Sequence, residues 1–147
     1  MAKKDKALSL ISDYENTYRH PDLERLEISG LFDLYPEKET KHQAEKSWPN
    51  QWISCGSAGV YLFLNEDLDI AYIGKTNHFG YRFGSYFAYD DSKKCKIKNT
   101  WKTIPRFVIT IAVPDQSKFE SAAIEEYLLS NIVTTDNTMG NKREVIL

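Results

Sequence analysis

The segment Gly74-Lys75-Thr76, within AYIGKTN, has the residue types that end the phosphate-binding loop of nucleotide-dependent enzymes. Such a loop needs a glycine five residues before Gly74, where its backbone N–H groups surround the phosphates. That position holds Asp69, and the upstream stretch LNEDLD contains three acidic residues and no glycine. Because carboxylates repel phosphate, the sequence argues against a nucleotide-binding loop, and Lys75 needs another role.

The basic residues are concentrated in one part of the chain. Residues 71–110 contain eight basic and two acidic residues, whereas residues 1–70 contain eight basic and thirteen acidic ones. A basic segment inside a chain with a net charge of −2 predicts a local anionic partner. The alternative is that the stretch KKCKIKNTWK is a solvated loop with nothing bound.

Composition excludes several classes of protein. The chain of 147 residues is 41% hydrophobic, which is enough for one domain with a core. It contains no apolar run near the roughly 20 residues of a membrane span, and its N-terminal apolar patch is too short for a secretory signal. Two cysteines without paired spacing and three separated histidines make a zinc site improbable and favour a reduced, cytoplasmic chain.

The N-terminal third predicts helices followed by a polar loop. Leu8, Ile11, Tyr14 and Tyr18 recur at helical spacing, so we expect an amphipathic helix from Lys4 to Tyr18. Leu23, Leu26 and Ile28 suggest a short second helix that ends at Gly30. The segment from Pro36 to Pro49 is polar and bounded by prolines, which indicates a loop or linker.

From Gly56 onward the hydrophobic pattern changes to that of strands. Val60, Leu62 and Leu64 alternate with two aromatic residues, and the run IAYIG follows after the loop NEDLD, which predicts a β-hairpin. Because side chains alternate between the two faces of a strand, this pairing can put Tyr61 and Tyr72 on a common face.

Three further elements follow the hairpin. Asn77 is expected to cap a helix over residues 78–89. Residues Ile104 to Val113 read as a third strand, expected at a sheet edge because Pro105 cannot donate a ladder hydrogen bond. Ser117 is expected to cap a helix that runs to Ile132, with Glu120 completing a capping box. The expected fold is α+β, a small antiparallel three-stranded sheet flanked by helices, with a helical N-terminal extension at residues 1–55.

The predicted hairpin carries two tripeptides, Gly59-Val60-Tyr61 and Tyr72-Ile73-Gly74. Arg82 stands ten positions after Tyr72, and Glu125 stands three and four positions before Leu128 and Leu129. With these features the chain resembles the GIY-YIG nuclease superfamily. The resemblance runs from Gly56 to about Asn141 and implies a nuclease domain over residues 56–147. The site residues that it implies are Tyr61, Tyr72, Lys75, Arg82, Tyr86, Glu125 and Asn137.

The chain looks most similar to the N-terminal nuclease domain of the bacterial excision-repair endonuclease. That domain also has a lysine after the second tripeptide and a tyrosine four residues beyond the arginine, as Lys75 and Tyr86 stand here. Two assignments keep a rival. Asn141 competes with Asn137, because the asparagine of the family usually follows a proline-containing turn, and Glu126 adjoins Glu125.

The resemblance implies hydrolysis of a phosphodiester bond with Mg²⁺, or Mn²⁺ as a substitute, held by Glu125. Arg82 would hold phosphate oxygens through its planar guanidinium. Either Tyr61 or Tyr72 would activate the water, although a phenol with a pKa of about 10 is only ~0.1% ionised at pH 7. Tyr86 would support the site through its hydroxyl, and Asn137 would orient a partner. Contacts to the nucleic-acid backbone are expected from Lys93, Lys94, Lys96, Lys98, Lys102 and Arg106.

The predicted function is that of a Mg²⁺-dependent DNA endonuclease that is structure-guided or weakly sequence-specific, with DNA as partner and no small-molecule cofactor. Only about fifty residues lie outside the predicted nuclease domain, which is little for a separate reading domain. The alternatives are a compact restriction-type endonuclease and a non-catalytic nucleic-acid-binding or interaction module on the same fold. Cleavage of DNA distinguishes an enzyme from a binding module.

Overall fold

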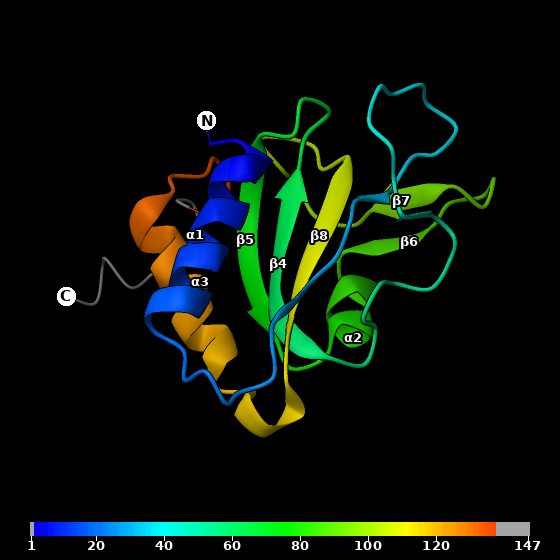
Figure 1. Cartoon of the computed structure of the whole chain (residues 1–147). Coiled ribbons are helices and arrows are strands. Elements are labelled where there is room, and N and C mark those ends of the chain that lie inside the picture. Colours follow the sequence, from blue (N-terminus) through cyan, green and yellow to red (C-terminus); the bar gives the residue numbers. More distant parts are fainter. Residues whose placement is uncertain (1, 138–147) are drawn as a thin grey trace.

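A computed structural model describes residues 2–137 of the chain (Figure 1). It confirms an α+β fold in which three α-helices, counted over these residues, accompany a mixed sheet. The helices are α1 (Lys4–Thr17), α2 (Phe79–Gly84) and α3 (Glu120–Asn131), with a 3₁₀ helix at Asp115–Ser117. The strands are β1 (Glu27–Ile28), β2 (Phe32–Asp33), β3 (Lys46–Ser47), β4 (Ala58–Leu64), β5 (Ile70–Thr76), β6 (Phe87–Tyr89), β7 (Cys95–Ile97) and β8 (Phe107–Val113).

The predicted hairpin is present and forms one side of the main sheet. β4 and β5 pair antiparallel, with Tyr61 opposite Gly74 and Phe63 opposite Tyr72. Residues directly opposite each other share a face of the sheet, so Tyr61 and Tyr72 lie on the same face, as predicted. β8 pairs with the other side of β4, and the strand order is β3-β2-β8-β4-β5. β5 therefore ends the sheet.

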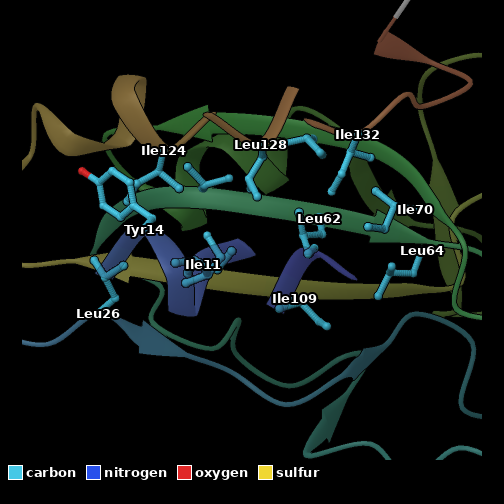
Figure 2. Packing of buried hydrophobic residues seen from close by; sticks show 14 of the residues in the cluster. Ile11, Tyr14, Leu26, Leu62, Leu64, Ile70, Ile109, Ile124, Leu128 and Ile132 are labelled. Carbon is cyan, nitrogen blue, oxygen red and sulfur yellow. The ribbon is translucent and has the colours of Figure 1, made fainter. Parts of the chain in front are cut away.

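Two cores lie on the two faces of this sheet. Figure 1 shows α1 and α3 side by side on one face, whereas α2 and the β6–β7 ribbon lie on the other side. Figure 2 shows the first core, in which Ile11 of α1 and Leu128 of α3 meet Leu62 of β4. The second core is aromatic and contains Tyr61, Phe63, Phe79, Phe83 and Tyr86.

The N-terminal segment joins the same sheet. The predicted helix at Leu23–Ile28 is wrong, because Glu27 and Ile28 form β1 and pair with Ala112 and Ile111 of β8. Pairing with a long buried strand outweighs the weak helical spacing of so short a segment. The polar loop is interrupted as well, since β3 pairs parallel with β2.

The third strand was expected at an edge, and this expectation is wrong. β8 pairs with β4 on one side and with β1 and β2 on the other, and all seven of its residues are buried. The strand begins at Phe107, so Pro105 stands outside the ladder and removes no hydrogen bond from it.

Both predicted helix caps are displaced. His78, not Asn77, caps α2, and its Nδ1 accepts a hydrogen bond from the Tyr81 N–H at 3.1 Å. α2 ends at Gly84, and Phe87–Tyr89, which was expected to continue the helix, forms strand β6 instead. Phe119 is the residue before α3, whereas Ser117 lies in the 3₁₀ helix and donates its hydroxyl hydrogen bond to Glu120 Oε2 at 2.7 Å.

A buried ion pair fastens α1 to α3. Arg19 donates from Nε to Glu120 Oε1 at 2.7 Å and from Nη2 to Glu120 Oε2 at 2.8 Å. The Tyr14 hydroxyl also donates to Glu120, at 2.9 Å. Ile11 and Tyr14 are buried as their helical spacing predicts, whereas Tyr18 is 67% exposed. The capping role expected for Glu120 is thus replaced by a role in joining two helices.

Candidate active site

Tyr61 of β4 is the centre of a hydrogen-bonded group of three predicted site residues. Its side chain is completely buried, and its hydroxyl lies 2.9 Å from the hydroxyl of Tyr86. Arg82 of α2 donates from Nε to the Tyr61 hydroxyl at 3.1 Å. The Arg82 guanidinium also lies over the Tyr86 ring, 4.9 Å from its centroid. The short helix α2 therefore carries the arginine to the tyrosine hairpin, as the resemblance implied.

The two glycines of the tripeptides make room for this group. A Cβ on Gly74 would collide with the hydroxyl and ring of Tyr61, with only 2.7 Å to Cε2. A Cβ on Gly59 would collide with the backbone carbonyl of Ile111 and lie 2.7 Å from the Phe79 ring. Cβ contacts this short require neighbouring atoms to move. Glycine at both positions allows Tyr61 and the start of α2 to pack directly on the strands.

Tyr72 lies beside this group on the edge strand β5. Its ring centroid is 6.1 Å from that of Tyr61, and its side chain is half-buried. Burial and the neighbouring Tyr86 raise the pKa of Tyr72 to about 12, while the positive charge of Arg82 acts in the opposite direction. Burial raises the pKa of Tyr61 still further. Tyr72 is thus both the more accessible and the more easily ionised of the two phenols.

Glu125 approaches the same place from α3. It is half-buried, and its negative charge is one of the causes that raise the pKa of Tyr72. The rival Glu126 is exposed. Leu128 is buried in the first core and Leu129 packs against it, as the register of the helix predicted. The electrostatic influence on Tyr72 favours Glu125 as the carboxylate of the site.

The donor set near Glu125 fits Mg²⁺ rather than a metal enclosed by protein ligands. No three His, Cys, Asp or Glu side chains are grouped to hold a metal ion among the residues that the structure describes. Mg²⁺ is commonly held by one or two carboxylates and keeps several waters or substrate oxygens as its other ligands. A single half-buried carboxylate at the edge of the sheet is compatible with that kind of coordination.

Lys75 is placed on the other side of the hairpin from Tyr61. It pairs with Val60, whose side chain belongs to the core beneath α1 and α3, and neighbouring residues of a strand face opposite sides. Lys75 is exposed and lines a cavity together with Lys118 and Phe119 at the start of α3. The sequence did not draw attention to these two residues. The one sequence feature that could have indicated them is their position directly before the helix that carries Glu125.

Asn137 is engaged with the backbone of β5. Its Nδ2 donates to the Ile73 carbonyl at 2.7 Å, and its Oδ1 accepts from the Ile73 N–H at 2.8 Å. Nearby, the Asp136 N–H donates to the Ala71 carbonyl at 3.1 Å, and the Ile70 N–H donates to the Ala2 carbonyl at 2.8 Å. The amide group of Asn137 is thus bound to the edge strand β5, and its expected role in orienting a partner stays a prediction. The rival Asn141 lies outside the described residues.

All five of the expected backbone-binding lysines are exposed on or near the β6–β7 ribbon. They are Lys93, Lys94, Lys96, Lys98 and Lys102. One of them is engaged within the protein, since the Lys98 ammonium donates to the Gly84 carbonyl at 2.7 Å. Exposure leaves the predicted phosphate contacts sterically open for the others.

The expectation for Arg106 is wrong. Its side chain is buried, and it donates from Nε and Nη2 to the two carboxylate oxygens of Asp33 at 2.8 and 3.0 Å. It also pairs with Glu66 at 2.5 Å. A guanidinium neutralised by two carboxylates inside the protein is not available to a nucleic-acid backbone. Arg106 instead ties β8 to β2.

Residues 57–135 match the sequence model of the GIY-YIG catalytic domain. No curated protein matches the chain significantly. Within residues 2–137, no helix is both long and apolar enough to cross a membrane. The matched segment covers more than half of the chain and includes the tyrosine hairpin, Arg82 and Glu125, and the protein therefore belongs to the GIY-YIG family of nucleases.

Proposed function

We propose that the protein is a Mg²⁺-dependent DNA endonuclease. The observation that carries this proposal is the meeting of three chemical groups at the edge of β5. Arg82 is held by the Tyr61 hydroxyl at 3.1 Å, Tyr72 lies beside them, and the charge of Glu125 acts on Tyr72. A cation, a phenol and a carboxylate in one place supply the parts that phosphodiester hydrolysis needs. Membership of a nuclease family supports a nucleic-acid substrate.

Arg82 is assigned to the phosphate. Its Nε is used in the hydrogen bond to Tyr61, which orients the planar guanidinium. The terminal nitrogens of that plane are the ones we assign to two phosphoryl oxygens. Because the arginine is already positioned before substrate binds, it can stabilise charge that develops in the transition state.

Tyr72 is assigned to the attacking water, and Tyr61 to positioning. Tyr61 is completely buried and is hydrogen-bonded to both Tyr86 and Arg82, so it has no exposed surface for a water nucleophile. Tyr72 is half-buried at the sheet edge, but its pKa of about 12 means that it needs nearby positive charge to lose its proton near neutral pH. Arg82 provides part of that charge. Mg²⁺ bound at Glu125 would polarise the phosphate and stabilise the leaving oxygen.

Weak or structure-guided specificity is the reading we favour over a restriction-type enzyme. Reading a long sequence normally requires additional elements that reach base edges. In this chain the described residues before Gly56 are used to build the sheet and its core, through β1, β2, β3 and α1. The exposed lysines of the β6–β7 ribbon would contact phosphates, which carry no sequence information directly.

The experiment is a nicking assay on supercoiled plasmid with Mg²⁺, with an EDTA reaction beside it. Glu125→Gln removes the proposed metal ligand with little change of volume, and Glu126→Gln is the matched control on the next residue. We expect the parent and Glu126→Gln to nick DNA in Mg²⁺ only, and Glu125→Gln to be inactive while retaining DNA affinity. Binding without cleavage by the parent would instead favour a non-catalytic module. Full activity of Glu125→Gln would reject the site.

A further inference from the structure

The cavity lined by Lys75 lies next to the proposed active site, on the opposite side of β5 from Tyr61. It has a volume of about 250 Å³ and lies between the end of β5 and the first turn of α3. Lys75, Lys118, Phe119 and Ser121 are among the residues that line it. The inference drawn from it rests on the proposed nuclease function.

Ser121 is the observation that points to a ligand. Its side chain is 4% exposed, and its hydroxyl finds no hydrogen-bond partner in the described part of the chain. A buried hydroxyl without a partner costs about 1–3 kcal/mol. Ser121 lines the cavity, so turning its hydroxyl toward a hydrogen-bond acceptor bound there would remove the penalty.

The charges around the cavity favour an anion. Lys75 and Lys118 are both exposed at its margin. The N-terminal turn of α3, a helix of 12 residues, adds the positive end of a helix dipole. Glu120 belongs to the same turn, but its carboxylate is buried against Arg19, Ser117 and Tyr14. Its negative charge is therefore compensated by the buried Arg19, and Glu120 is not among the residues that line the cavity.

The cavity is also close to the proposed chemistry. Ser121 and Glu125 are four residues apart in α3, so they lie on one face of the helix about 6 Å apart along its axis. An anion beside Ser121 would thus lie one helical turn from the carboxylate assigned to the metal. In a nucleic-acid substrate, the nearest such anion is a phosphate next to the one that is cleaved.

Phe119 gives this subsite a second component. Phe119 lines the cavity and is 76% exposed, so its ring is available to a ligand beside the two lysines. Aromatic rings exposed next to basic groups stack on bases of single-stranded nucleic acid, and a base can stack in this way only when it is unpaired.

We propose that this cavity binds an unpaired nucleotide that adjoins the scissile phosphodiester bond of the substrate. Lys118, Lys75 and the Ser121 hydroxyl bind its phosphate, and the ring of Phe119 stacks on its base. The preferred substrate is accordingly DNA with an unpaired nucleotide beside the cut, such as a flap or a bulge.

The phosphate half of the proposal is tested with methylphosphonate substitutions, which remove the charge of one phosphate at a time on both sides of the mapped cut. For the parent, one adjacent substitution should lower kcat/KM about tenfold, as for loss of a hydrogen bond to a charged group. Lys118→Ala and Ser121→Ala should each lower kcat/KM several-fold on normal DNA. For both variants, the methylphosphonate that slows the parent should have no further effect. Lys41→Ala, which removes an exposed lysine in the loop between β2 and β3, is the matched control and should be slowed by that methylphosphonate as the parent is.

The base half is tested by Phe119→Ala on two substrates. It should lower kcat/KM about tenfold on DNA with an unpaired nucleotide beside the cut, the size expected for one lost base stack, and leave a fully paired duplex unchanged. Equal losses on both substrates would overturn the stacking role. Additive effects of Lys118→Ala and every methylphosphonate would overturn the phosphate subsite. A parent that cleaves nothing would reject the proposed function alone. In that case the same criteria are applied to binding in EDTA, with DNA that has an unpaired nucleotide and carries a methylphosphonate at each position in turn.

Discussion

Gly74 lies directly opposite Tyr61 on the neighbouring strand, and the ring of Tyr61 occupies the space that a side chain at position 74 would need. The hydroxyl of that ring then reaches both Tyr86 and Arg82. The glycine of the second tripeptide is thus a steric condition for the position of the tyrosine of the first.

Gly74→Ala should therefore impair the site without abolishing the fold. The added methyl group must push the Tyr61 ring off β5, at a cost of about 1–3 kcal/mol for overpacking, and the Tyr61–Arg82 hydrogen bond should break. We expect a loss of thermal stability together with at least a tenfold fall in cleavage rate. Gly56→Ala is the control, because nothing lies within 4 Å of its Cβ position. Equal effects of the two substitutions would show that the contact with Tyr61 is unimportant.

Removing single hydroxyl groups should separate the two tyrosines. Tyr72→Phe takes away the group assigned to the water, so the single-turnover rate should fall about a hundredfold or more, in the range of general-base catalysis. Tyr61→Phe leaves Arg82 Nε and the Tyr86 hydroxyl without their shared partner, so we expect a smaller loss of rate and about 1 kcal/mol less stability. A parental rate for Tyr72→Phe would show that the Tyr72 hydroxyl does not activate the water.

Removal of Arg82 and removal of the exposed lysines on the β6–β7 ribbon should affect different steps, namely the cleavage rate and DNA binding. Arg82→Ala should lower the single-turnover rate on saturating DNA by roughly a hundredfold or more, as for loss of one preorganised donor, with little change in affinity. A variant with alanine at Lys93, Lys94, Lys96 and Lys98 should keep its rate but reduce the salt slope of binding by about one unit per contact. Lys98 is expected to contribute least, because its ammonium is bonded to Gly84. An unchanged salt slope would mean that the ribbon is a solvated surface.

Glu120 should make the fold sensitive to acid. Burial alone would raise its pKa, but hydrogen bonds from Arg19, Ser117 and Tyr14 outweigh burial and lower the pKa below its usual range. Its stabilising effect is therefore complete above the ordinary glutamate pKa of about 4.3 and is lost as the pH falls through the lowered value.

Glu120→Gln tests this by urea denaturation between pH 3 and pH 7. At pH 7 the variant should be less stable by about 3 kcal/mol, because the buried Arg19 loses one of its two carboxylate partners and keeps only Glu15. The difference should begin to shrink below about pH 4, where the carboxylate of the unfolded parent chain becomes protonated. A difference that does not vary with pH would indicate that packing, and not the charge, is responsible.

Local patterns predicted the hairpin and much of the site. Alternation of side chains along β4 and β5 is sufficient to place Tyr61 and Tyr72 on one face. The helical period of α3 likewise distinguishes Glu125 from Glu126, because Leu128 must face the core. These inferences need only neighbouring residues.

The failures depended on partners far away in the sequence. Arg106 looked like a free basic residue, but its partner Asp33 is 73 residues distant. The segment at Glu27–Ile28 is a strand because β8 offers it a pairing edge, not because of its own composition. Likewise, Lys118 and Ser121 border a cavity only because α3 lies against the end of β5, which no local pattern reports.

The two ends of the described chain cover the outer edge of β5. Ala2 accepts from the Ile70 N–H, Asp136 donates to the Ala71 carbonyl, and the amide of Asn137 uses both backbone groups of Ile73. An uncovered edge strand is a template on which a second copy can add its own strand, and such addition leads to aggregation. Here that template is closed from Ile70 to Ile73, immediately before Lys75 and the cavity. The edge at which we place substrate is thereby protected against intermolecular strand pairing even when no DNA is bound.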